Sequence, residues 1–122
     1  DYNRPGKDGK PRELHVAKAR EVIVNYSPAQ LESLRFSGNA DITPDLLATC
    51  DKFTVHKYEI AGEKALNVTE KSFVSLLITD GEGTLTSGGE TVNVKKGESY
   101  FLPAASGPYA VRGACQTLVT TV

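Results

Sequence analysis

Four side chains of this 122-residue sequence are typical zinc ligands: Cys50, Cys115, His15 and His56. Structural zinc sites usually hold two ligands two to five residues apart, and no two of these four are that close. The spacing therefore favours separate roles, with the cysteines as small buried residues and His56 as a packing residue on a strand. No histidine or helix start adjoins Cys115, so a thiol nucleophile is not indicated. We predict no metal site in this segment.

The basic residues near the start of the chain are the other chemical candidates. Arg4, Lys10 and Arg12 lie in residues 1–12, a stretch with four Pro or Gly and no aliphatic side chain. Guanidinium and ammonium groups bind phosphate, so these three residues are candidate ligands for a phosphorylated substrate. The same composition is typical of a solvated loop, which is the simpler interpretation.

Composition excludes several classes of protein. The chain has 14 Lys and Arg against 15 Asp and Glu, a formal charge of −1 that does not indicate a nucleic-acid or membrane-surface binder. Its longest apolar run, residues 73–78, is far shorter than the ~18 residues that span a bilayer. We therefore expect a cytoplasmic protein without a nucleic-acid or membrane partner. Because the sequence begins at Asp1 and contains no Met, we also expect a processed or excised segment, a fragment of a longer chain.

Helical patterns occupy the N-terminal part of the chain. Apolar residues recur at helical spacing over residues 11–24. Ser27 followed by Pro28 is a cap and first-turn signature, which predicts a second helix over residues 28–34. A further helical turn could begin at Thr43 and carry Leu46 and Leu47. We predict that residues 1–51 form a loop and short helices.

From residue 52 onward the pattern is typical of a β-sandwich or barrel, with turn residues between short runs of β-branched and aromatic residues. The predicted strands are 53–60, 65–68, 72–79, 83–87, 90–94, 99–102, 108–112 and 116–122. Gly88-Gly89 predicts a two-residue hairpin, because glycine accepts positive φ at both positions. This turn would set Leu85 opposite Val92 and Gly83 opposite Val94. Gly81-Glu82-Gly83 lacks the third glycine and the following helix of a dinucleotide loop, so we interpret it as a turn or bulge.

The segment from Gly81 to Ala104 resembles the core of a cupin, a small β-barrel of jelly-roll type. Gly81 and Gly83 resemble the end of the family's first motif, and Gly97-Glu98 followed by Leu102-Pro103 resembles its second. The resemblance implies a mainly β fold, with a cupin barrel over residues 52–122 preceded by a short helical N-terminal arm. Metal-binding cupins carry histidines around these motifs, whereas residues 67–78 and 104–111 contain none. The resemblance therefore implies a cupin that binds no metal.

A longer resemblance covers nearly the whole chain. The runs Asp1-Tyr2-Asn3-Arg4, Arg12-Glu13-Leu14-His15 and Lys96-Gly97-Glu98 are similar in order and spacing to the C-terminal third of bacterial class I mannose-6-phosphate isomerases. That family consists of zinc-dependent aldose–ketose isomerases that interconvert mannose 6-phosphate and fructose 6-phosphate. Its zinc ligands and its catalytic arginine lie before the position that matches Asp1. The resemblance implies that this segment is the second, metal-free cupin, with zinc and every catalytic residue upstream.

The resemblance also implies a role for the segment, which is structural support of the catalytic domain. We expect it to pack against the N-terminal catalytic cupin of the same chain, to be inactive alone, and to self-associate through the apolar surface that its arm exposes. One alternative is a free-standing, metal-independent cupin that binds a sugar or other small ligand in its barrel. Another is a metal-free enzyme that uses Arg4, Lys10 or Arg12 on a phosphorylated sugar.

Overall fold

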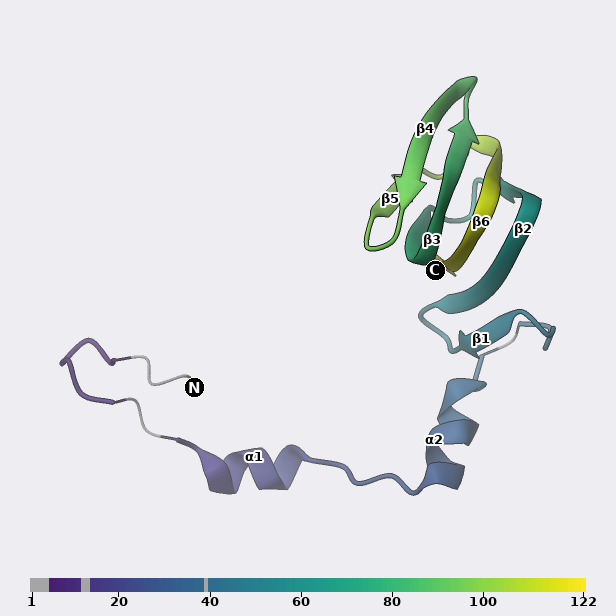
Figure 1. Cartoon of the computed structure of the whole chain (residues 1–122). Helices are drawn as coiled ribbons and strands as arrows, with labels where there is room; N and C mark the ends of the chain where they lie inside the picture. Colours follow the sequence, from purple (N-terminus) through teal and green to yellow (C-terminus); the bar gives the residue numbers. More distant parts are fainter. Residues whose placement is uncertain (1–4, 12–13, 39) are drawn as a thin grey trace.

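The computed structural model of the chain describes residues 5–11, 14–38 and 40–122. Figure 1 shows a barrel of strands and an arm of two helices that extends from it, which confirms the predicted mainly β fold with a helical N-terminal arm. The elements in chain order are α1 (Val16–Val22), α2 (Pro28–Arg35), β1 (Leu46–Thr49), β2 (Thr54–Val68), β3 (Val74–Ser87), β4 (Glu90–Lys95), β5 (Ser99–Leu102) and β6 (Gly107–Thr121).

The strands form one antiparallel sheet. Its order is β1-β2-β6-β3-β4, and β5 pairs with β3 as well. The barrel has two halves, one beside β5 and one beside β4. β5 pairs with residues 74–77 of β3, and β4 pairs with residues 82–87 of the same strand. The long strands β2, β6 and β3 therefore run through both halves. The Gly88-Gly89 hairpin is confirmed, with φ of +59° and +86° at the two glycines. The predicted partners also hold, Leu85 with Val92 and Gly83 with Val94.

The predicted breaks within the long strands are wrong. Residues 54–60 and 65–68 belong to the single strand β2, residues 74–79 and 83–87 to β3, and residues 108–112 and 116–121 to β6. Residues 53, 72, 73 and 122 of the predicted strands lie outside them. The apparent breaks contain glycine, and Gly62, Gly81 and Gly113 adopt positive φ without leaving the sheet. A glycine that reads as a turn in the sequence is here a local bend in a continuous strand.

Gly62, Gly113 and Gly83 lie side by side across the sheet. Gly62 pairs with Gly113, and Gly113 pairs with Gly83. A Cβ on Gly113 would lie 2.6 Å from the carbonyl oxygen of Glu82 and 2.7 Å from the Cα of Gly83. β6 and β3 therefore approach more closely here than any residue with a side chain allows, and this row lies near the boundary between the two halves of the barrel.

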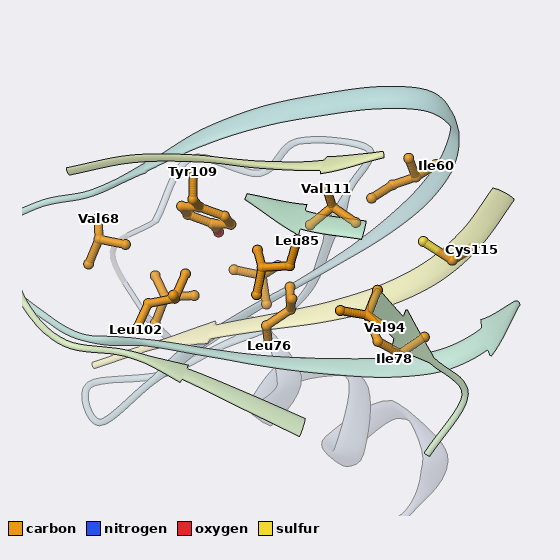
Figure 2. Close-up of a cluster of buried hydrophobic side chains, with 12 residues drawn as sticks. Ile60, Val68, Leu76, Ile78, Leu85, Val94, Leu102, Tyr109, Val111 and Cys115 are labelled. Carbon is orange, nitrogen blue, oxygen red and sulfur yellow. The ribbon is translucent and has the colours of Figure 1, made fainter. Parts of the chain in front are cut away.

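The core fills the space between the two halves. Inward residues of the long strands meet there, and Leu76, Ile78 and Val111 are fully buried (Figure 2). Burying an aliphatic side chain of this size stabilises a fold by roughly 1.5–3 kcal/mol. The whole cluster consists of Ile60, Val68, Val74, Leu76, Ile78, Leu85, Val94, Leu102, Tyr109, Val111, Cys115 and Val119.

The helical arm is less packed than the barrel. α2 begins at a capping box, in which Ser27 and Gln30 exchange side-chain to backbone hydrogen bonds, and it matches the predicted helix. α1 is shorter than the predicted 11–24, and it has no side-chain cap and no buried residue. Short helices without tertiary packing are marginal, so α1 keeps only two turns of the predicted helix.

The predicted helical turn over residues 43–47 is wrong. Leu46–Thr49 is strand β1, in which Leu46 and Thr49 are buried and pair with β2. Tertiary pairing with β2 outweighs the local proline signal at Pro44. The sheet therefore begins N-terminal to the predicted domain boundary at residue 52.

Candidate functional site

The four candidate zinc ligands lie in different parts of the molecule. His15 precedes α1 in the arm, and Cys50 follows β1. His56 lies on β2, where its ring stacks on Tyr58 with centroids 5.9 Å apart. Cys115 is in the core, and burial raises the pKa of its thiol, which makes it a poor nucleophile. Among residues 5–11, 14–38 and 40–122, no three His, Cys, Asp or Glu side chains form a group that could hold a metal ion.

Of the basic phosphate candidates, only Lys10 lies within the described residues, and Arg4 and Arg12 lie outside them. Lys10 is exposed, in a turn in which its carbonyl accepts a 2.7 Å hydrogen bond from the amide of Gly6. The turn is at the end of the arm farthest from the barrel (Figure 1). The structure therefore does not bring Lys10 together with the polar groups of the barrel.

A hollow of about 670 Å³ lies on the outer face of the barrel, beside β4. Two cationic and two acidic side chains line it together with polar groups: Glu82, Thr84, Asn93, Lys95, Glu98 and Arg112. The opposite charges balance, so the hollow selects neither an anion nor a cation.

Three of the four charged groups of the hollow, those of Arg112, Glu98 and Lys95, already have protein partners. The Nε of Arg112 donates a 2.8 Å hydrogen bond to Glu63. Glu98 accepts hydrogen bonds from the Tyr100 hydroxyl at 2.7 Å and from the amide of Lys95 at 3.0 Å. The pKa of Glu98 is lowered mainly by the hydrogen bond from Tyr100. The same bond raises the pKa of Tyr100. Glu98 therefore stays ionised, as a brace for the turn between β4 and β5 rather than as a general acid.

The barrel interior is filled with hydrocarbon. Figure 2 shows Leu76, Ile78, Leu85 and Val111 meeting at the centre, and none is more than 4% exposed. Aliphatic side chains cannot ligate a metal or hydrogen-bond a sugar. The inward residues of this barrel therefore do not fit a zinc ion.

Two polar side chains of β6 are buried in the interior, and the half-buried His56, Tyr58 and Lys64 face inward from β2. Thr117 is buried, and its hydroxyl has no hydrogen-bond partner among the described residues. Burial, with a smaller effect of Tyr58, raises the pKa of Tyr109 to about 12. A neutral hydroxyl on Thr117 and on Tyr109 provides no base near neutral pH.

One polar cluster could not be found from the sequence. The Lys64 Nζ lies 4.3 Å from the centre of the Tyr58 ring and 4.0 Å from Asp45 Oδ2. Burial and the Asp45 carboxylate raise the pKa of Tyr58. Tyr58 and Lys64 lie on the same face of β2, and Asp45 joins them because β1, which it precedes, pairs with β2. The cluster ties the start of β1 to the barrel.

Comparison with known proteins shows to which family the chain belongs. The model of the family described as mannose-6-phosphate isomerase, cupin domain, matches residues 44–122. The chain belongs to this family. It is 31% identical over 120 residues to the mannose-6-phosphate isomerase ManA of Bacillus subtilis, an alignment that covers 98% of this chain and 38% of that protein. It is 26% identical to a mannose-6-phosphate isomerase of Streptococcus mutans, over 84% of this chain and 32% of the relative.

The isomerase cupin fold is also found among solved structures. The crystal structure of the mannose 6-phosphate isomerase from Bacillus subtilis matches with a TM-score of 0.63 and 26% identity, over 100% of this chain and 38% of that one. An RmlC-like cupin from Desulfovibrio desulfuricans matches with a TM-score of 0.55 and 19% identity over 64% of this chain and 78% of its own, which shows the fold alone. The chain thus spans less than two-fifths of the isomerases that it matches. Within the described residues, no helix has the length and apolar character needed to cross a membrane.

Proposed function

We propose that this chain is the second, metal-free cupin of a zinc-dependent mannose-6-phosphate isomerase, and that it supports the catalytic cupin without contributing to the chemistry. The match of residues 44–122 to the isomerase cupin family carries this proposal. The full-length enzyme would isomerise mannose 6-phosphate, as the names of the relatives indicate, and the family resemblance implies fructose 6-phosphate as the other sugar.

The inner face of the barrel supports a role outside the chemistry. Aldose–ketose isomerisation moves a proton between adjacent carbons, which needs a base and a group that polarises the substrate oxygens. The inward positions carry Leu76, Ile78 and Val111 instead, and the pKa of Cys115 is raised by burial. We assign zinc and the catalytic residues to the part of the enzyme outside this chain, and no step of the reaction to these residues.

The arm supports a role in assembly. Val22 and Ile42 are 78% and 77% exposed. A cluster of exposed apolar residues of this extent marks a surface that another part of the protein covers, and we assign that part to the catalytic cupin of the same chain. The exposed apolar residues of the arm are Leu14, Val16, Val22, Ile23, Val24, Tyr26, Leu31, Leu34 and Ile42.

A coupled assay of mannose 6-phosphate isomerisation with added zinc tests the proposal. The full-length enzyme should be active, whereas the 122-residue chain should show no activity above a blank. Isomerisation by the isolated chain would refute the non-catalytic role. A full-length protein that is folded and zinc-loaded but does not isomerise mannose 6-phosphate would refute the assignment of the reaction.

The same arm should make the isolated chain self-associate. Sedimentation velocity should show dimers or larger species whose share falls when Val22 and Leu31 are replaced by Ser. A matched variant with Lys18→Ser and Glu32→Ser, which changes charged positions of the same two helices, should sediment like the wild type. A monomeric wild-type chain across the concentration range would contradict the prediction.

The two alternative functions have less support. A sugar inside the barrel would need open space lined by polar groups, and the buried core is closely packed with mostly aliphatic side chains. A metal-free enzyme that uses Arg4, Lys10 or Arg12 would lose activity when these residues are replaced by Ala in the full-length protein. Unchanged kinetics would remove that alternative.

A further inference from the structure

The outer surface of the barrel differs sharply between its two halves. Beside β4, the outward residues include Glu63, Glu82, Lys95 and Arg112, as expected for a sheet face in water. Beside β5, the outward residues of β5, β3 and β6 include no charged side chain, and the next strand, β2, places Lys57 opposite Leu118. We call this second area the uncharged face; it consists of Phe73, Ser75, Leu77, Ser99, Phe101, Leu118 and Thr120.

Strand register makes the uncharged face continuous. Phe101 pairs with Ser75, which pairs with Thr120, and in the next row Ser99 pairs with Leu77, which pairs with Leu118. These residues alternate with the buried Leu76, Leu102 and Val119, so they point away from the core. Both rows therefore lie on one surface of three neighbouring strands.

Two apolar side chains of this face, Phe101 and Leu77, are exposed, whereas Phe73 is half-buried. The rings of Phe73 and Phe101 are in contact, with centroids 4.9 Å apart. Phe101 is nevertheless 63% exposed, and Leu77 is 36% exposed. Exposed aromatic residues together with a lack of charged ones are typical of the buried centre of a protein interface.

The chain's own arm does not cover this face. α2 is held against β1 by a hydrogen bond from Arg35 Nε to the carbonyl of Leu47 and by a bridge between Phe36 and Thr49. β1 lies at the edge of the sheet opposite β4 and β5, and Figure 1 shows β5 on the side of the barrel away from β1 and α2. A surface that covers Phe101 and Leu77 would therefore come from outside the described residues.

We infer that the uncharged face is a second docking surface for the remaining part of the isomerase chain, separate from the arm. The relatives that match are about two and a half times as long as this chain, since it covers 38% of their length. The remainder is therefore large enough to contact both the arm and the opposite edge of the barrel. This inference rests on the proposed function, because it takes its partner from the full-length isomerase.

Thiol accessibility in the full-length enzyme tests the inference. Leu77→Cys places a thiol on the uncharged face, and Val92→Cys is the matched control, since Val92 is an aliphatic residue of β4 with a similar exposure of 44%. Native enzyme is treated with iodoacetamide, and the modified peptides are followed by mass spectrometry. We expect position 77 to react about tenfold more slowly than position 92, because a dry interface excludes the reagent. The two rates should become equal in denaturant.

Each outcome decides the inference. Equal rates in the native enzyme would overturn it, and so would slow labelling at position 77 that speeds up on dilution, because a second copy would then be the partner. If Leu77→Cys does not fold, Ser99→Cys on the same face replaces it. The isomerase assay of the wild-type enzyme is a separate readout, so a failure of the proposed function is distinguishable from a failure of this surface.

Discussion

The row of paired glycines gives the sharpest test of how the barrel is built. Gly62 and Gly113 are cross-strand partners with φ of +112° and +135°, so alanine is strained at both positions. Nothing lies within 4 Å of a Cβ built on Gly62, whereas a Cβ on Gly113 meets the backbone of β3. Gly62→Ala therefore measures backbone strain alone, and Gly113→Ala measures strain plus the close approach of two strands.

The expected magnitudes follow from these two contributions. Holding a residue with a side chain in a sparsely populated conformation costs about 1–3 kcal/mol, which is our expectation for Gly62→Ala. At Gly113 the Cβ would be 2.6 Å from the carbonyl oxygen of Glu82, and ordinary contact begins at 3.4 Å, so β3 must move by about 0.8 Å. Overpacking of this kind adds about 1–3 kcal/mol. We expect Gly113→Ala to cost about 2–6 kcal/mol in total.

Urea unfolding followed by circular dichroism measures both variants. The free energy of unfolding should fall in the order wild type, Gly62→Ala, Gly113→Ala, with the two variants separated by at least about 1 kcal/mol. Gly83→Ala is a third variant with ordinary φ, in which the Cβ clashes with the carbonyl of Arg112. The free energy of unfolding of Gly83→Ala should therefore fall because of the clash alone, with no contribution from backbone strain. If Gly113→Ala and Gly62→Ala are equally stable, the close approach of β6 and β3 does not exclude a side chain at position 113. That result would refute the reasoning.

Three further predictions concern ionisable groups. Burial raises the pKa of Tyr109 to about 12, above the usual value of about 10. The stability that this shift contributes is full below pH 10 and is lost as pH rises towards 12, by at most about 2–3 kcal/mol and less where water reaches the hydroxyl. Tyr109→Phe should flatten the dependence of urea midpoints on pH in this range, and an unchanged slope would contradict it. The hydrogen bond from Tyr100 and the amide of Lys95 lower the pKa of Glu98, so the stability it contributes is present above its ordinary pKa and is lost as pH falls through the lowered value. Glu98→Gln should be less stable than wild type at pH 7, and the gap in thermal midpoint should close in acid; a constant gap would argue against the hydrogen bond. Lys96 pairs with Asp80 at 2.9 Å, with both side chains more than two-thirds exposed. Lys96→Ala should therefore change the free energy of unfolding by less than ~1 kcal/mol, and a larger loss that persists in high salt would show that the pair is not an ordinary surface one.

Local chemistry in the sequence predicted part of this fold correctly. The Gly88-Gly89 hairpin and its register were predictable because two glycines with positive φ fix both the turn and the partners next to it. The capping box of Ser27 and the following Pro28 likewise fixed the start of α2. These signals act within a few residues of the chain, so no tertiary information was needed.

Other elements needed contacts that the sequence does not display. Residues 46–49 looked like a helical turn after Pro44, and they are a strand because β2 supplies the hydrogen bonds. Gly62 and Gly113 looked like strand breaks, and they are bends because each has its partner on a neighbouring strand. The contact of Asp45 with Lys64 is of the same kind, since the pairing of β1 with β2 brings Asp45 to Lys64 and Tyr58.

The sequence by itself determined the family. Its motifs lie in a fixed order along the chain, and the absence of histidine from residues 67–78 and 104–111 can be counted directly. Only the tertiary structure decided which surfaces are uncovered. Leu76 and Leu77 are adjacent and identical in type, yet one is fully buried and the other is 36% exposed on the uncharged face. Alternation along a strand separates the two residues, but the packing of β5, β3 and β6 around the core determines which side is covered.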